Sequence, residues 1–206
     1  MLNHDYPKSI ELKDGREVIL RPLVQDDFDK LFSFFQVLPA EDRLFLVHDV
    51  SDPDLIRKWT DELDFERVIP LVALEQDRIV GDGTLHMASR GWMRHVGHIR
   101  LVTARSHRHC GLGAFIARDL VALAAERGLQ KLQAHVIENG AGAVRMFEAV
   151  GFNKAVVIEK LVRDQHGTDR DLAIMINDVV SLTQTMEVWM QDMMIPAFRG
   201  PGEGSY

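Results

Sequence analysis

The segment LVTARSHRHCGLGA, residues 101–114, constrains the fold of this chain more than any other part of it. A strand-like run passes into a loop with two glycines, and an apolar stripe at helical spacing follows the loop. Glycines let backbone N–H groups approach a ligand closely, and the first turn of a helix carries a partial positive charge. The segment therefore predicts a strand, a loop that binds an anion such as a pyrophosphate, and a helix over residues 111–128, with Arg108 at the edge of the loop.

Taken alone, the glycine loop leaves other interpretations open. It is not a P-loop, because no Gly-Lys-Ser/Thr follows, and Ile116 stands where GxGxxG needs its third glycine. A dinucleotide site also lacks the acidic residue that is expected after the next strand. The remaining alternative is a turn into a packed helix that binds no ligand.

Hydrophobic periodicity predicts an α/β fold with a mixed sheet. Asp14-Gly15 predicts a hairpin within residues 9–23, and Gln25-Asp26-Asp27 and Asp52-Pro53 supply caps for two helices. Further helices are predicted over 40–45, 111–128 and 141–150, and strands over 68–75, 79–88, 96–103, 131–137, 152–162 and 172–176.

Composition limits the classes of protein and of partner. The chain has 206 residues, 46% of them hydrophobic, which suffices for one domain with a sizeable core. No apolar run approaches the roughly 18 to 20 residues of a membrane span, and the start lacks a basic region followed by an apolar stretch. The lone Cys110 cannot form an internal disulfide. We therefore expect a cytoplasmic protein that does not associate with membranes.

The net charge of −7 argues against a binder of nucleic acid, whose surface is normally basic. It is compatible with a cationic substrate such as an amine, or it serves only solubility. We expect one domain over residues 1–177, followed by a C-terminal helical extension and frayed tail over 178–206. The Met-rich stripe of that extension predicts packing or a homodimer contact, with a lid as the alternative.

Two motifs in this chain resemble those of the GCN5-related N-acetyltransferases, the GNAT superfamily. Residues 108–113, RHCGLG, resemble its R/Q-x-x-G-x-G/A signature, and residues 138–152, ENGAGAVRMFEAVGF, resemble its downstream segment that ends in Gly-Phe. The motifs and the predicted elements occur in the family's order, so the resemblance covers roughly residues 9–177. A narrower likeness, over residues 12–46, is to the GNAT domains of bacterial protein-lysine acetyltransferases.

The resemblance implies the acyl-CoA N-acyltransferase fold, a mixed and mostly antiparallel sheet with flanking helices, here with an extra C-terminal helix. Two central parallel strands, 96–103 and 131–137, would splay apart and receive acetyl-CoA or another acyl-CoA as co-substrate. The residues implied to bind this cofactor are Leu101, Val102, Thr103, Arg108, His109, Cys110, Gly111, Leu112, Gly113, Ala114, Asn139 and Phe147.

The implied reaction is direct transfer of the acyl group to a primary amine of a small molecule or a protein lysine. His98 stands where many members carry a catalytic Glu, and His86 is expected to face it across a hairpin, so the pair is predicted to relay a proton. The alternative is two polar groups in a half-exposed sheet. Phe147 stands where related enzymes often carry a Tyr that gives a proton to the leaving thiolate. A catalytically weak or inactive domain that senses acyl-CoA is therefore the alternative function. The histidines lack a familiar ligand spacing, so no metal is predicted.

Overall fold

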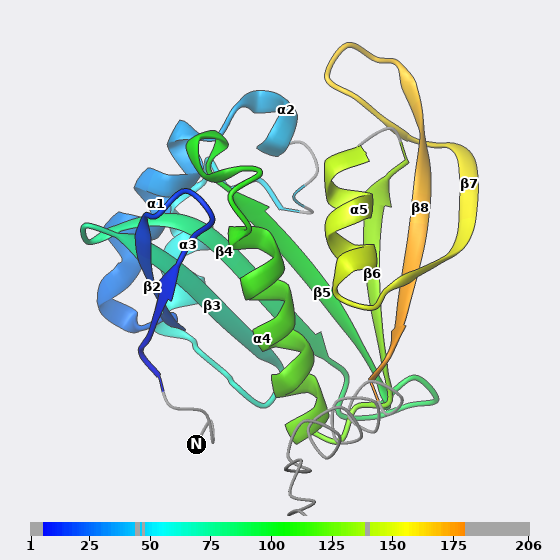
Figure 1. Cartoon of the computed structure of the whole chain (residues 1–206), viewed down its shortest axis with the longest axis horizontal. Coiled ribbons are helices and arrows are strands. Elements are labelled where there is room, and N and C mark those ends of the chain that lie inside the picture. Colours follow the sequence, from blue (N-terminus) through cyan, green and yellow to red (C-terminus); the bar gives the residue numbers. More distant parts are fainter. Residues whose placement is uncertain (1–5, 44–45, 47, 139–140, 180–206) are drawn as a thin grey trace, which may run out of the picture.

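One eight-stranded sheet with the strand order β1-β2-β3-β4-β5-β6-β8-β7 organises this computed structural model (Figure 1). The structure describes residues 6–43, 46, 48–138 and 141–179. The strands are β1 (Lys8–Glu11), β2 (Glu17–Pro22), β3 (Val68–Glu75), β4 (Arg78–Met87), β5 (Val96–Thr103), β6 (Lys131–Ile137), β7 (Asn153–Arg163) and β8 (Asp169–Asp178). The α-helices are α1 (Phe28–Val37), α2 (Ala40–Arg43), α3 (Pro53–Asp61), α4 (Leu112–Glu126) and α5 (Ala141–Ala149), and short 3₁₀ turns occupy Gln25–Asp27 and Arg105–His107.

The pairing of β5 with β6 opens the middle of the sheet. These two strands form the parallel pair of the described sheet. They are paired only over Val96–Ile99 of β5 and Lys131–Ala134 of β6. Both strands continue beyond these residues and diverge toward the start of α4 (Figure 1). The predicted fold class and the predicted splay are therefore confirmed.

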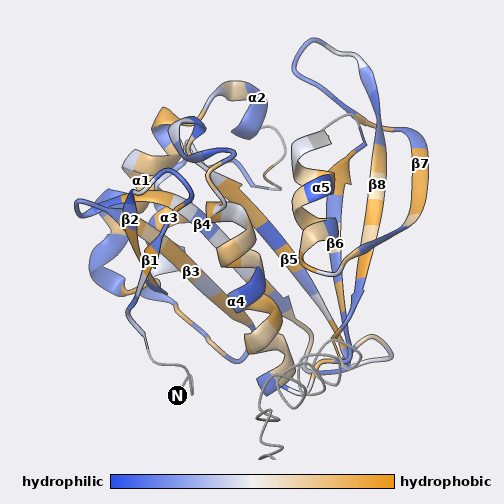
Figure 2. Cartoon of the chain, in the orientation of Figure 1, coloured by the Kyte–Doolittle hydropathy of each residue, from blue (hydrophilic) through white to orange (hydrophobic). Residues whose placement is uncertain are grey.

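Helix α4 covers one face of the sheet at very short range. Its stripe of Leu112, Ile116 and Leu120 is fully buried in the main core. A Cβ on Gly83 of β4 would lie only 2.3 Å from Ile116 Cγ2, so glycine is required where the helix presses on the strand. Figure 2 shows apolar residues concentrated along the central strands and on α4.

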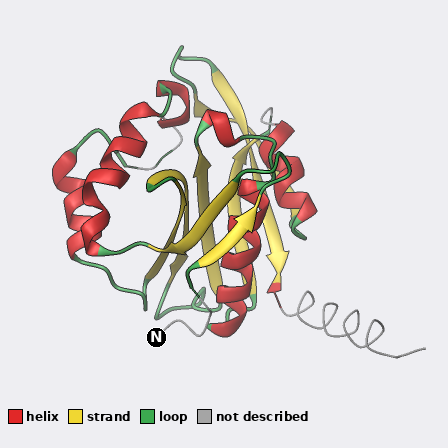
Figure 3. Ribbon diagram, turned by 60° about the vertical axis from the view of Figure 1, so that its left-hand side comes forward, coloured by secondary structure: helices red, strands yellow, loops and turns green. Residues whose placement is uncertain are grey.

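Helices α1 and α3 pack on the opposite face and form a second core, so helices flank the sheet on both sides (Figure 3). Asp52 caps α3 as predicted, because its side chain accepts from the Asp54 N–H at 2.9 Å. Asp27 stands at the N-cap of α1, but its side chain makes no cap hydrogen bond to that helix, so the predicted cap is not formed. Its buried carboxylate accepts from the Val24 N–H and from both terminal nitrogens of Arg21, at 2.6 and 2.8 Å.

The C-terminal strand is longer than the sequence pattern predicts. β8 covers Asp169–Asp178 instead of residues 172–176, because it pairs along its length with both β6 and β7. The predicted extension, apart from its first two residues, lies outside the described part of the chain. Within the described part, no helix is long and apolar enough to cross a membrane.

Candidate active site

The open edge of β5 presents backbone groups to the splay. The Ala104 N–H donates to the Val80 carbonyl at 2.8 Å, which directs this residue toward β4. Because backbone groups alternate along a strand, those of Val102 also point toward β4, whereas those of Leu101 and Thr103 point toward the splay. Two of the three predicted strand residues are thus available to pair with a ligand through their backbone.

The N-terminus of α4, called its mouth below, lies at the end of this edge. Gly111 caps the helix with φ +93°, and His109 before it also has a positive φ of +61°. The first donor that the helix satisfies is the N–H of Phe115, which binds the Gly111 carbonyl at 3.1 Å. The N–H groups of Leu112, Gly113 and Ala114 therefore have no acceptor within the helix and are free for an anion.

Gly113 faces the space between β5 and α5. A Cβ built on it would lie 3.5 Å from Leu101 Cδ2 and 3.7 Å from Met146 Cγ. The side chain that is missing here would project toward the predicted cofactor path.

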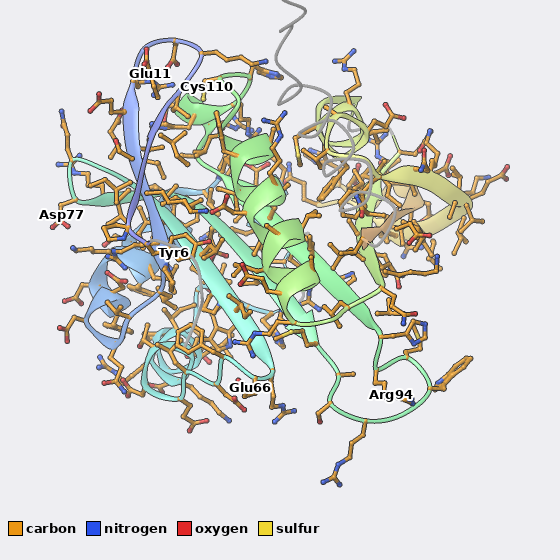
Figure 4. The ribbon with its side chains drawn as sticks, turned by 60° about the horizontal axis from the view of Figure 1, so that its bottom comes forward. Tyr6, Glu11, Glu66, Asp77, Arg94 and Cys110 are labelled. Carbon is orange, nitrogen blue, oxygen red and sulfur yellow. The ribbon has the colours of Figure 1, made fainter. Side chains whose placement is uncertain are left out.

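Cys110 supports the loop from inside. Its buried thiol donates to the His107 carbonyl at 3.0 Å, and its own carbonyl accepts from the Lys13 N–H at 3.0 Å. Figure 4 shows Cys110 at the start of α4, beside the hairpin that carries Glu11. The thiol therefore points into the protein, and only the backbone of Cys110 belongs to the loop surface.

The arginines of the loop reach across to α2. Arg108 Nη2 lies 2.5 Å from Asp42 Oδ2, and Arg105 pairs with Glu41. Both arginines are exposed, so these pairs can exchange with other anions. Arg108, the predicted phosphate partner, is thus held at the loop's edge by a carboxylate.

The structure brings His86 and His98 together, as the sequence predicts. They are register partners on β4 and β5, on the face opposite α4. His86 Nε2 lies 3.0 Å from Thr84 Oγ1, and the His98 ring packs edge-on against His135 with 4.8 Å between centroids. Among the described residues, nothing hydrogen-bonds the buried Nε2 of His98.

The surroundings keep both imidazoles neutral. Burial, followed by nearby positive charges that include Arg100, lowers the pKa of His86 and of His98 from 6.5 to about 4. Burial and Arg100 also lower the pKa of His135. At neutral pH His86 and His98 are therefore uncharged and bind added protons weakly.

Asp82 is a site candidate that the sequence interpretation missed. It lies on the same face of β4 as Thr84 and His86. The residues opposite it on the neighbouring strands, Val72 and Val102, are apolar. Burial raises the pKa of its carboxyl from 3.8 to about 7. In the sequence, Asp82 is visible only as an acidic residue within a predicted strand, and this pattern does not indicate that its side chain is buried.

A hollow of about 280 Å³ adjoins the two histidines. Its lining is His86, Met87, Ala88, Met93, Val96, Gly97, His98 and Gln133. A larger hollow of about 710 Å³ lies at the far end of α4, and Glu66 and Arg94 of its lining are labelled in Figure 4. The smaller hollow lies at the β4–β5 hairpin end of the sheet, beside the residues of β5 and β6 that are still paired.

Comparison with known proteins decides the family. The model of the Acetyltransferase (GNAT) family matches residues 32–152, which is more than half of the chain. The chain belongs to the GNAT family. The resemblance seen in the sequence is therefore confirmed.

Solved GNAT structures share the fold at low sequence identity. The Streptococcus pneumoniae GNAT acetyltransferase superposes with a TM-score of 0.71 at 19% identity, covering 78% of this chain and 99% of that one. The GNAT domain of S. lividans PAT gives 0.69 at 18% identity, covering 83% and 96%. The Salmonella typhimurium protein yncA, solved with its cofactor acetyl-CoA, gives 0.68 at 17% identity, covering 79% and 94%.

The two remaining residues that the resemblance implies for cofactor binding are Phe147 and Asn139. Phe147 is buried, and its ring meets that of Phe152 edge-on with 5.0 Å between centroids. Asn139 lies outside the described residues. Across the described ranges, no three His, Cys, Asp or Glu side chains converge as a set of metal ligands.

Proposed function

We propose that this GNAT protein transfers the acetyl group of acetyl-CoA to a primary amine of a small molecule or a protein lysine by direct attack. The observation that carries the proposal is the continuity of the open edge of β5 with the free N–H groups at the mouth of α4. One extended ligand with a diphosphate at one end and an amide-bearing arm at the other fits both features. Acyl-CoA has this chemistry.

The cofactor would bind mainly through the backbone. Leu101 and Thr103 would pair with the pantetheine arm as an added strand does. The N–H groups of His109, Gly111, Gly113 and Ala114 would hold the diphosphate, with Arg108 exchanging Asp42 for a phosphate. Contacts from Asn139 and Phe147 remain predictions of the resemblance.

The site favours an uncharged amine. The environment that lowers the pKa of His86 and His98 to about 4 also disfavours an ammonium beside them. A substrate amine that enters this site gives up its proton more readily than it does in water. Only the free base has the lone pair that attacks a carbonyl.

We assign the proton-handling roles by position and pKa. His98 would accept a hydrogen bond from the amine, and His86 is its register partner in the relay. Because both bind protons weakly, Asp82 on the same face, with a pKa of about 7, is the group suited to hold the proton at neutral pH.

The chemical step then balances without a covalent enzyme intermediate. The amine nitrogen forms a bond to the thioester carbon, and the carbonyl oxygen takes up negative charge that a backbone N–H stabilises. The C–S bond breaks as the oxyanion collapses, and the nitrogen loses its proton to the protein. Phe147 has no proton to give, so the thiolate is protonated by solvent.

An acyl-CoA sensor without efficient catalysis is the second candidate. The buried Phe147 and the low pKa of both histidines favour it. Both candidates bind the cofactor, and only the first consumes it. A cytoplasmic location and a homodimer are further predictions that rest on the sequence.

Calorimetry and a thiol-release assay test the proposal. We expect saturable binding of acetyl-CoA, and release of CoA thiol when amines and lysine peptides are added. A His98→Ala variant should lose turnover while it keeps cofactor affinity, and His166→Ala in the exposed β7–β8 turn is the matched control. Binding without thiol release across the panel would select the sensor, and no binding of any CoA species would refute both candidates.

A further inference from the structure

Arg100 is a cation without an anionic partner on the same face as the two histidines. It stands on β5 between His98 and Val102, and its register partner is Thr84. Its Nε atom is buried and has no hydrogen-bond partner among the residues that the structure describes. Within the described ranges, no carboxylate forms an ion pair with Arg100.

The groups around Arg100 are consistent with a charge that no carboxylate of the described residues neutralises. Burial first, and the positive charge of Arg100 in addition, lower the pKa of His86, His98 and His135. Burial also lowers the pKa of Arg100 itself. Asp82 lies opposite Val102 and not opposite Arg100, and among the described residues no ion pair joins the two side chains.

A partly buried cation without a partner is costly, and such groups mark ligand sites. The forked N–H donors of a guanidinium match the two oxygens of a carboxylate. The neighbouring imidazoles are neutral and add N–H donors without adding a competing negative charge. The local chemistry is therefore that of a site for a small anion.

Arg100 is also next to the place where the proposed reaction occurs. Leu101, the following residue, presents its backbone to the splay, and His98, the preceding residue on the same face, is the proposed partner of the amine. An anion held by Arg100 would thus belong to a molecule that takes part in the transfer.

We infer that Arg100 recognises a carboxylate of the substrate beside the reacting centre, which makes it a specificity-determining residue. This inference rests on the proposed function. The carboxylate has two possible sources: an acceptor that carries it near its amine, such as an amino acid, or a dicarboxylic acyl group on CoA, such as succinyl.

Two arms of one experiment distinguish these sources. The acceptor arm compares kcat/KM for free amino acids with that for the corresponding amino-acid amides, with acetyl-CoA as donor. The donor arm compares the affinities of succinyl-CoA and acetyl-CoA by calorimetry. Where turnover is absent, the acceptor arm is measured as binding of acid and amide to the CoA-loaded protein.

We expect the carboxylate-bearing member to be favoured about ten- to a hundredfold in one arm. Arg100→Met should abolish this preference, and Arg100→Lys should keep part of it. Arg163→Met, on the exposed β7 and away from the site, is the matched control and should change nothing. Circular dichroism and denaturant unfolding establish that each variant is folded, and the ratio between paired ligands is insensitive to a general loss of active protein.

The outcomes separate this inference from the proposed function. Acylation of amides as fast as acids, with no preference for succinyl-CoA, would overturn the role of Arg100 and leave the acetyltransferase intact. A preference that survives in Arg100→Met would overturn it as well. Failure to bind any CoA species would remove the proposed function and this inference together.

Discussion

Replacing Gly113 with alanine should separate the stability of α4 from its capacity to bind a diphosphate. Gly113 is the second residue of the helix, and its φ is not positive. The added methyl would meet Leu101 Cδ2 at 3.5 Å and Met146 Cγ at 3.7 Å, which are ordinary van der Waals distances. The protein can therefore accept the methyl without strain.

The two effects have opposite signs. Alanine is favoured over glycine within a helix by about 0.5 to 1 kcal/mol, and at the first turn we expect about 0.5 kcal/mol of added stability. In the proposed complex, the methyl would push a phosphate away from the N–H groups of residues 113 and 114. Losing two charge-assisted hydrogen bonds, at about 1.5 kcal/mol each, weakens binding by about a hundredfold.

Thermal unfolding and calorimetry measure both effects on one sample. A gain of 0.5 kcal/mol corresponds to roughly 1 to 2 °C in Tm for a chain of this size. Gly128→Ala is the control, because Gly128 follows the other end of α4 with φ +70°. It should lose about 1 kcal/mol of stability and keep its affinity for CoA. Unchanged affinity in a stable Gly113→Ala variant would refute the assignment of the phosphate loop.

Three further predictions concern packing and protonation. Gly83→Ala should destabilise the fold by about 1 to 3 kcal/mol in urea unfolding, because its Cβ would meet Ile116 Cγ2. A smaller residue at position 116 should recover part of this loss. Equal stability of Gly83→Ala and the parent would contradict the close packing. Because the pKa of His98 falls to about 4 on folding, the unfolded chain binds more protons between pH 4 and 6.5, so the unfolding free energy should decrease as the pH falls. His98→Gln should remove about 2 kcal/mol of that decrease at pH 5, and parallel pH curves for variant and parent would disprove the burial effect. The pKa of Asp82 rises to about 7 on folding, so ionisation destabilises the folded state as the pH rises. Asp82→Asn should therefore stabilise the protein by about 4 kcal/mol at pH 8 and by about 2 kcal/mol at pH 5, and a gain that does not change with pH would be the contrary result.

Local patterns accounted for the elements and the loop. Asp14-Gly15 and Asp52-Pro53 specify a turn and a helix start through backbone preferences that need no tertiary context. The juxtaposition of His86 and His98 also followed from the sequence, because both flank one hairpin and its length sets the register. The glycine loop was recognised because glycine identity itself determines the backbone there.

Properties that arise from packing could not be predicted. The raised pKa of Asp82 and the unpaired charge of Arg100 depend on burial between strands and helices that are distant in sequence. The pairing of Arg108 with Asp42 depends on where α2 lies relative to the loop. Each of these is a relation between segments, which composition and periodicity do not encode.

The ion pair between Arg108 and Asp42 joins the loop before α4 to the short helix α2. A diphosphate at the loop would compete with Asp42 for the same guanidinium, so donor binding and the attachment of α2 are thermodynamically linked. Loading the thioester would then loosen the attachment of α2 to the loop, and removing Asp42 would in turn make the guanidinium more available to the diphosphate.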